Sequence, residues 1–300
     1  MTLTASQTQE TTTREVITTS YILEDSQEPL PRPSPQLKKN IFDNFSLAGK
    51  VAVITGGSRG IGYAVAECYC QAGASVALIA SNAERVEQSA KALRAEYGCK
   101  VESYTLDVAQ PAKCDEAIAQ IVQDFGTIDI FVGNAGIIWT DGGIISDAGL
   151  NNGIEKWRRI MEINLNANYY FARSVGQIFK EKKSGSFILT SSMSGSICNV
   201  PNYQTAYNAS KAGLKHMAKS LAVEWASFNA RVNSISPGYI DSGISDVLDP
   251  AILAKWNSLI PFGRQGLPQE LVGAYLYLAS DASTYTSGSD IVIDGGYCSV

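Results

Sequence analysis

The stretch Gly56-Gly57-Ser58-Arg59-Gly60-Ile61-Gly62 decides how this chain of 300 residues is interpreted. It follows a short apolar run, 51–55, and opens a segment whose apolar residues recur at helical spacing. Glycines here allow a tight turn after a strand, a close approach of backbone to a ligand and close packing of the helix. The start of such a helix offers unpaired N–H groups to a phosphate. An ordinary turn is the alternative, but the position between strand and helix favours a dinucleotide site formed by Gly56, Ser58, Arg59, Gly60, Ile61 and Gly62.

The end of the next apolar run indicates which dinucleotide binds. A carboxylate roughly 20 residues after the glycines would bind the ribose 2′-hydroxyl of NAD. This run ends instead in Ile79-Ala80-Ser81-Asn82, with no acidic residue. Arg59 can pair with the 2′-phosphate of NADP, and Ser81 and Asn82 can add hydrogen bonds. We therefore expect NADP(H); the alternative is that Arg59 only faces solvent.

Short apolar runs alternate with longer amphipathic stretches from Lys50 onward. Continuous apolar runs are typical of parallel strands covered on both faces. The alternation predicts an α/β fold: a doubly wound Rossmann parallel sheet of about seven strands with helices on both faces, in one domain over 46–300. The expected strands are 51–55, 75–80, 101–106, 128–133, 185–190, 231–235 and 290–293.

Residues 1–45 have a different composition. Eight of the first twenty residues are Thr, and Pro29-Leu30-Pro31-Arg32-Pro33-Ser34-Pro35 favours an extended backbone. Such a segment buries too little apolar surface to offset the entropy of ordering it, so we expect a flexible or loosely docked tail. A docking peptide for a proline-binding module is the alternative. Ile41, Phe42, Phe45 and Leu47 are expected to attach its end to the domain.

Charge and cysteine usage exclude several classes of protein. The 24 basic and 29 acidic residues give a net charge of −5, which argues against nucleic acid as a partner. The single histidine, His216, excludes a multi-histidine metal site, so we expect no metal. The six cysteines form no CxxC pair and are expected to be free thiols. No apolar run is long enough to cross a membrane and no targeting signal is evident, which favours the cytoplasm.

Tyr207 and Lys211 open a strongly periodic stretch. In a helix this spacing puts both side chains on one face. A phenol with a pKa of about 10 is a poor proton donor or acceptor at neutral pH, and a neighbouring ammonium would lower that pKa. The spacing also arises by chance. Ser192 follows the fifth expected strand, where ligands of open α/β sheets bind, although serines there often only form turns.

Together these motifs resemble the short-chain dehydrogenase/reductase family from Leu47 to the C-terminus. Within the family, the stretches 231–241 and 279–288 are similar to those of fungal NADP-dependent mannitol dehydrogenases, sorbose reductases and yeast carbonyl reductases. The motifs that carry the resemblance are Thr55…Gly56…Gly60…Gly62, Asp107-Val108, Asn134-Ala135-Gly136, Asn164, Ser192, Tyr207…Lys211, Pro237-Gly238 and Asp294-Gly295-Gly296.

The resemblance implies roles for individual residues. Tyr207 would exchange a proton with the substrate oxygen, Ser192 would hydrogen-bond that oxygen, and Lys211 would hold the nicotinamide ribose and lower the tyrosine pKa. Asn164 would maintain a water-linked proton path to Lys211. The cofactor would also contact Asp107, Val108, Asn134, Ala135, Gly136, Tyr207, Lys211, Pro237, Gly238, Ile240 and Ser242.

Two positions depart from the family pattern. The family usually has two asparagines before Ala135-Gly136, and the first is Gly133 here. The family threonine near the nicotinamide carboxamide is Ser242, which keeps the hydroxyl.

The expected function is NADPH-dependent, reversible reduction of a ketone or ketose to a secondary alcohol or polyol. The alternatives are a 3-oxoacyl-carrier reductase and a non-catalytic NADP(H)-binding regulator. Aromatic residues after the fourth and sixth strands and before Pro261 are candidate pocket walls or plain packing. The substrate-pocket candidates are Trp139, Ser194, Tyr239 and Trp256. The resemblance also implies a homotetramer formed through the helix that bears Tyr207 and the one before it.

Overall fold

The protein is described from a computed structural model that covers residues 34–140, 142–243 and 250–300. All but the last part of the expected tail, 1–45, lies outside these residues. Within that last part, Ile41–Phe45 forms a short 3₁₀ helix. Ile41 and Phe42 are exposed, whereas Asn44 is buried and its side chain bonds the backbone of Lys38 at both N–H and carbonyl. The fully buried Leu47, whose backbone N–H donates to the Ala72 carbonyl at 2.8 Å, therefore attaches this segment to the domain, and the expectation for Ile41 and Phe42 is wrong.

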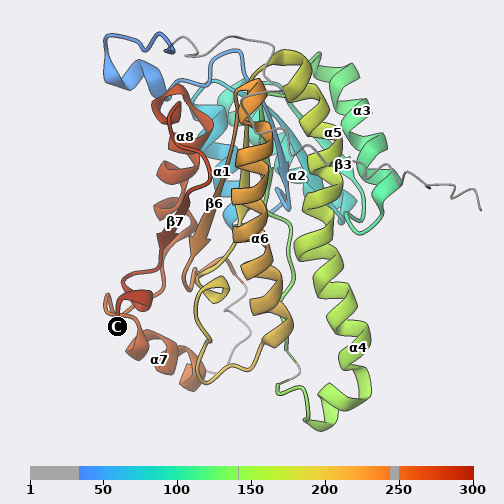
Figure 1. Ribbon diagram of the computed structural model, residues 1–300, viewed down its shortest axis with the longest axis vertical. Coiled ribbons are helices and arrows are strands. Elements are labelled where there is room, and N and C mark those ends of the chain that lie inside the picture. Colours follow the sequence, from blue (N-terminus) through green and yellow to red (C-terminus); the bar gives the residue numbers. More distant parts are fainter. Residues whose placement is uncertain (1–33, 141, 244–249) are drawn as a thin grey trace, which may run out of the picture.

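A seven-stranded parallel sheet forms the centre of the molecule, in the order β3-β2-β1-β4-β5-β6-β7 (Figure 1). This confirms the predicted fold class and all seven predicted strands. Strand β6 runs further than expected because β7 pairs with it as far as Pro237. The strands are β1 (Val51–Thr55), β2 (Ser75–Ala80), β3 (Val101–Thr105), β4 (Ile130–Gly133), β5 (Gly185–Thr190), β6 (Ala230–Pro237) and β7 (Asp290–Ile293).

Helices cover both faces of the sheet. Alternate strand residues point to opposite faces, so Val53 packs on the side of α3, α5 and α6 while Ile54 packs on the side of α1, α2 and α8. On the first face Phe131 of β4 stacks on Phe187 of β5, with ring centroids 4.7 Å apart. The helices are α1 (Gly60–Gln71), α2 (Ala83–Tyr97), α3 (Pro111–Phe125), α4 (Asp147–Met161), α5 (Ala167–Lys182), α6 (Thr205–Glu224), α7 (Pro250–Leu259) and α8 (Val272–Ala279).

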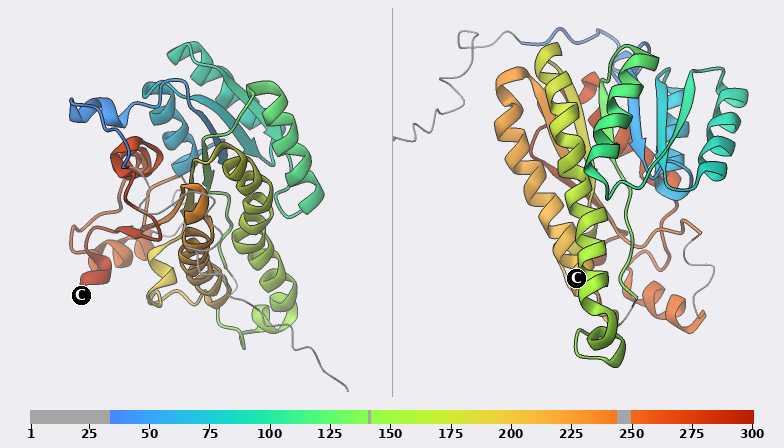
Figure 2. Two further views of the ribbon diagram at one scale, coloured as in Figure 1. Left: turned by 45° about the horizontal axis from the view of Figure 1, so that its top comes forward. Right: turned by 90° about the vertical axis from the view of Figure 1, so that its right-hand side faces the viewer.

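Helices α4 and α5 form one long rod that extends past the sheet, as the right-hand view of Figure 2 shows. They are joined by a π-helical turn, Glu162–Asn166. A π turn inserts an extra residue into a helix and is frequent at functional sites. Here it contains Asn164, which is fully buried.

The carboxyl ends of the strands all face one edge of the sheet, which lies at the bottom in Figure 1. The first turns of α4 and α6, together with α7, gather below this edge. In open parallel sheets this edge is where ligands bind.

Candidate active site

The glycine turn, residues 56–62, requires glycine at Gly56, Gly60 and Gly62. Gly56 and Gly60 have φ values of +66° and +55°, which other residues rarely adopt. A Cβ on Gly62 would lie 2.4 Å from the carbonyl oxygen of Gly56. Helix α1 begins at Gly60, and its N-cap residue, Arg59, makes no side-chain cap. The first N–H groups of α1 are therefore open to an anion, which fits the pyrophosphate of a dinucleotide.

Thr55 and Asn134 fasten the glycine turn to the end of β4. The Thr55 hydroxyl accepts the backbone N–H groups of Asn134 and Ala135 at 2.9 and 3.0 Å. The Asn134 side chain donates to the carbonyls of Thr55 and Gly56 at 3.1 and 3.4 Å. Asn134 thus fixes the position of the glycine turn relative to β4.

The side chains expected to recognise the 2′-phosphate are open to solvent. Arg59, Ser81 and Asn82 are all exposed. Asn82 also caps α2, because its Oδ1 accepts the Arg85 N–H at 2.8 Å. Ser89 on α2 donates to the Ser58 carbonyl at 3.1 Å, which ties α2 to the glycine turn.

Asp107 follows β3 and is ion-paired with Arg159 of α4, with 2.8 Å between its Oδ2 and the arginine Nη2. Burial opposes ionisation, but hydrogen bonds from the Ala109 N–H and from Arg159 keep the pKa of Asp107 below its usual range. The neighbouring Val108 is buried. Sequence reasoning missed Arg159, which lies 52 residues away from Asp107.

Tyr207, Lys211 and Ser192 lie together where β5 meets α6. The Ser192 side chain lies close enough to the Tyr207 hydroxyl to affect its pKa. Lys211 is 4% exposed, and its Nζ lies 5.5 Å from the centre of the Tyr207 ring. The same Nζ donates to the carbonyl of Thr190, the last residue of β5, at 2.8 Å.

Burial dominates the electrostatics of this pair. Burial raises the pKa of Tyr207, and only the nearby Ser192 side chain works in the other direction. Burial also lowers the pKa of Lys211 to about 8. Lys211 itself does not contribute to the pKa shift of Tyr207, so the lowering of the tyrosine pKa by its ammonium stays a prediction.

Asn164 clamps the chain that leaves β4. Its Oδ1 accepts the Ile137 N–H at 2.8 Å, and its Nδ2 donates to the Ile137 carbonyl at 2.9 Å. Nδ2 also reaches the Ser210 hydroxyl at 3.2 Å. A Cβ on Gly136 would lie 3.4 Å from the Asn164 Oδ1 and 3.6 Å from the Lys211 Nζ, so the backbone of Gly136 passes close to both side chains.

Gly133 departs from the family pattern, and Asn168 fills the space beside it. A Cβ on Gly133 would lie 1.9 Å from the Asn168 Oδ1. Asn168 is buried on the first turn of α5 and donates its Nδ2 to the Asn164 carbonyl at 2.9 Å. A residue on another element thus occupies this space and supports Asn164.

The segment after β6 closes the site near the glycine turn. A Cβ on Gly60 would lie 3.1 Å from the Cβ of Ser242, so Ser242 and the turn are in contact range. A Cβ on Gly238 would lie 2.6 Å from the Cα of Asp294, which shows how closely Pro237-Gly238 packs on the end of β7. Ile240 pairs with Gly266 as an isolated parallel bridge.

Comparisons with known proteins identify the family. A family model described as enoyl-(acyl carrier protein) reductase matches residues 56–298. A sorbose reductase of Candida albicans is 57% identical over 269 residues, which cover 90% of this chain and 94% of the relative. The chain belongs to the short-chain dehydrogenase/reductase family. It is an oxidoreductase of that family.

Two further relatives cover the same part of the chain. A probable NADP-dependent mannitol dehydrogenase of Yarrowia lipolytica is 52% identical and covers 90% of this chain and 95% of its own length. The crystal structure of an NADPH-dependent 3-quinuclidinone reductase from Rhodotorula rubra superimposes with a TM-score of 0.85. It is 43% identical and covers 91% of this chain and all of its own.

In this short-chain dehydrogenase/reductase, a cluster of uncharged polar side chains lies next to the Tyr207–Ser192 pair. We call Ser194, Asn199, Gln204 and Tyr239 the polar cluster. The Asn199 Oδ1 accepts from the Ser194 hydroxyl at 2.7 Å and from the Gln204 Nε2 at 2.6 Å. The Asn199 Nδ2 donates to the Tyr239 hydroxyl at 3.3 Å. Sequence reasoning found Ser194 and Tyr239 but missed Asn199 and Gln204, whose only signal was their position between Ser192 and Tyr207.

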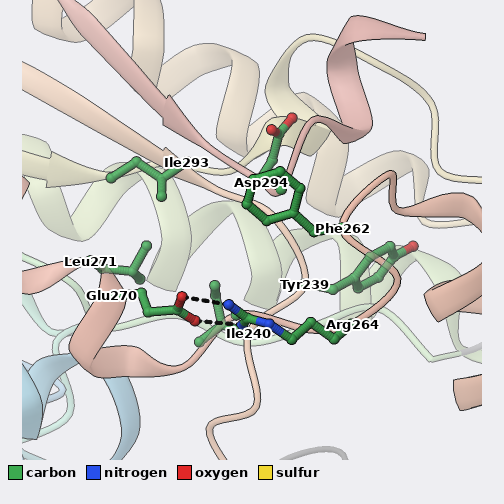
Figure 3. Close-up of a pocket in the computed structure, with 10 residues that line it drawn as sticks. Tyr239, Ile240, Phe262, Arg264, Glu270, Leu271, Ile293 and Asp294 are labelled. Carbon is green, nitrogen blue, oxygen red and sulfur yellow. Dashed lines mark hydrogen bonds and ion pairs between the residues drawn. The ribbon is translucent and has the colours of Figure 1, made fainter.

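Tyr239, a member of the polar cluster, also lines a small cavity. The cavity has a volume of about 90 Å³ and lies between Ile240, Leu271 and the end of β7 (Figure 3). The ion pair between Arg264 and Glu270, with two contacts of 2.7 Å, borders it. Tyr239 also stacks on Trp256 of α7, with ring centroids 4.4 Å apart and planes within 16°.

Trp139 belongs to a small apolar cluster that packs against Tyr207. It is 8% exposed and packs with Ile160, Ala206 and the ring of Tyr207. Its Nε1 donates to the Gly142 carbonyl at 2.8 Å. His216 is exposed on α6.

The described residues contain neither a candidate metal site nor a candidate membrane span. Over 34–140, 142–243 and 250–300, no three His, Cys, Asp or Glu side chains gather in a way that could hold a metal ion. Over the same residues, no helix combines the length and apolarity that a membrane span requires.

Proposed function

We propose that this protein reduces a ketose or a related ketone to the corresponding alcohol, reversibly, with Tyr207 exchanging the proton. The observation that carries the proposal is the proximity of the Ser192 and Tyr207 hydroxyls. They lie beside a buried Lys211, at the sheet edge that also carries the glycine turn. Sorbose and mannitol in the names of the two fungal relatives favour a ketose or polyol.

The cofactor is NADP(H). The names of the mannitol dehydrogenase and of the quinuclidinone reductase both specify it. The glycine turn fits the pyrophosphate, and Arg59 lies exposed beside it with Ser81. When bound, NADPH supplies a hydride to the carbonyl carbon.

The residues of the chain contribute position and protons. Ser192 hydrogen-bonds the carbonyl oxygen and makes its carbon more electrophilic. Because burial raises its pKa, Tyr207 carries its proton at neutral pH and donates it as the oxygen gains charge. Lys211, with a pKa of about 8, holds a proton below that pH and stays close to the tyrosine ring. Asn164 fixes the chain segment after β4 beside them, through its bond with the Ile137 N–H.

A panel of carbonyl compounds tests this function against the alternatives. NADPH oxidation is measured with sorbose, fructose, xylulose, an aryl ketone and a 3-oxoacyl thioester. We expect turnover with at least one ketose, faster than with the thioester. Preference for the thioester would favour the acyl-carrier reductase to which the family model's description refers. Cofactor binding without turnover of any member would favour a binding protein.

We also propose a homotetramer that works in the cytoplasm. Tyr169 on α5 and Val223 on α6 are each 55% exposed. Apolar side chains on these helices suit contact with further copies of the chain. Light scattering of the purified protein tests the assembly, and a mass equal to that of one chain would contradict it.

A further inference from the structure

The proposed function leaves open whether the site distinguishes a polyhydroxylated ketone from a plain one. The polar cluster bears directly on this question because it begins two residues after Ser192. The backbone N–H of Ser194 donates to the Ser192 hydroxyl at 3.1 Å. At its other end, Tyr239 is close enough to Tyr207 for the two to interact electrostatically. The cluster therefore extends along the position of a substrate held by Ser192 and Tyr207.

Gln204 is the member whose hydrogen bonds are incomplete. Its Nε2 is held by two acceptors, the Asn199 Oδ1 at 2.6 Å and the Ser194 hydroxyl at 3.2 Å. These two bonds fix the plane of the amide, so the Oε1 on the same group must point away from Asn199 and Ser194. Among the described residues, this Oε1 has no hydrogen-bond partner. An oriented amide oxygen without a partner is an acceptor for an O–H donor.

Gln204 also lies at the same end of α6 as Tyr207. It is the N-cap residue of α6, three positions before Tyr207, and its backbone carbonyl accepts the Asn208 N–H at 2.9 Å. Its side chain is therefore anchored on the same rigid helix end as the proton donor. Asn199 and Ser194 are 4% exposed, so the side chains that hold Gln204 are themselves fixed by packing.

We propose that Gln204 accepts a hydrogen bond from a substrate hydroxyl, with Asn199 and Ser194 positioning its amide. The polar cluster thereby selects ketones that carry hydroxyl groups near the carbonyl. Gln204 is half-buried, so a bound substrate covers its Oε1. A hydroxylated ketone then supplies a partner for this oxygen, whereas a plain ketone leaves it without one and is penalised. This inference rests on the proposed function and names its substrate class.

The test compares two five-carbon 2-ketones, xylulose and 2-pentanone, which differ in their hydroxyl groups. Values of kcat/KM with NADPH are measured for the wild type and for Gln204→Met, which keeps the volume but removes the acceptor. We expect Gln204→Met to lower kcat/KM for xylulose about tenfold and to leave that for 2-pentanone within about twofold. Asn199→Leu should change the ratio in the same direction, because the amide of Gln204 loses one of its two holders.

Two controls separate specificity from damage. Gln120→Met makes the same chemical change on the exposed surface of α3, where Gln120 bonds only Asp124, and should leave both substrates unchanged. The NADPH dissociation constant and the melting temperature of Gln204→Met should match those of the wild type.

The outcomes distinguish this inference from the proposed function. An equal loss for both ketones in Gln204→Met, or wild-type preference for 2-pentanone, would overturn the inference while ketone reduction stands. Failure of the wild type to reduce any carbonyl compound in the panel would overturn the proposed function itself, and the inference with it.

Discussion

The glycine turn and the polar cluster lie at the same edge of the same sheet, but they are built from different parts of the chain. The glycine turn presents backbone N–H groups, and no side chain fits at Gly62 because a Cβ there would lie 2.4 Å from the Gly56 carbonyl oxygen. The polar cluster presents side chains held by one another, with Asn199 bonding three partners. A backbone site tolerates little change in sequence, whereas a side-chain site can change its ligand by single substitutions.

The largest expected effect is at the backbone site. Gly62→Ala should raise the NADPH dissociation constant by at least about a hundredfold, because the new methyl group must displace the Gly56 carbonyl and the Asn134 amide. Titration with NADPH measures this. Gly273→Ala in α8 is the matched control, since a Cβ there meets nothing within 4 Å. An unchanged NADPH affinity in Gly62→Ala would contradict the claim that the glycine turn tolerates little change in sequence.

The pH dependence of stability tests the environment of Lys211. Its pKa of about 8 in the folded protein lies below the ordinary value of 10.5, so the unfolded chain binds the proton more strongly. Burying the protonated lysine destabilises the folded protein. This destabilisation is complete below about pH 8 and disappears as the pH rises through 10.5, a change in the free energy of unfolding on the order of 3 kcal/mol.

The measurement is urea unfolding of the cofactor-free protein at several pH values from about pH 7 to about pH 10.5. The stability of the wild type relative to Lys211→Met should rise across this window. Lys219→Met, on the exposed face of the same helix, should show no such trend. A difference between wild type and Lys211→Met that does not vary with pH would contradict the burial of an unpaired ammonium.

Gly133 and Asn168 provide a smaller and more local test. Gly133→Ala should lower the free energy of unfolding by about 1–3 kcal/mol, because the methyl group overlaps the Asn168 Oδ1. The same change in an Asn168→Ala background should cost clearly less, since the space is then open. Additive effects in this double-mutant cycle would show that Asn168 does not occupy the place next to Gly133.

The smallest effect concerns cofactor selection. Arg59→Leu should reduce the ratio of kcat/KM with NADPH to that with NADH about tenfold, because a guanidinium paired with the 2′-phosphate is lost. Steady-state kinetics with both cofactors measures the ratio. A ratio equal to that of the wild type would mean that Arg59 only faces solvent.

Much of the fold could be predicted from the sequence, because most of the buried strands are continuous apolar runs bounded by turn residues. The glycine turn and the Tyr207–Lys211 spacing could be found for a similar reason, since both are local patterns. The partnership of Gly133 with Asn168 could not, because it joins residues 35 positions apart that meet only across β4 and α5. The raised pKa of Tyr207 was also missed, since the degree of burial is a property of the folded site.

The central claim is that Tyr207 moves the proton and does not hold the cofactor site together. Tyr207→Phe removes only the hydroxyl, so we expect the NADPH dissociation constant and the melting temperature to stay near wild-type values while kcat for ketose reduction falls about 10²–10⁴-fold. Single-turnover measurements at saturating NADPH test this most directly. A Tyr207→Phe variant that reduces the ketose within threefold of the wild-type rate would contradict the account.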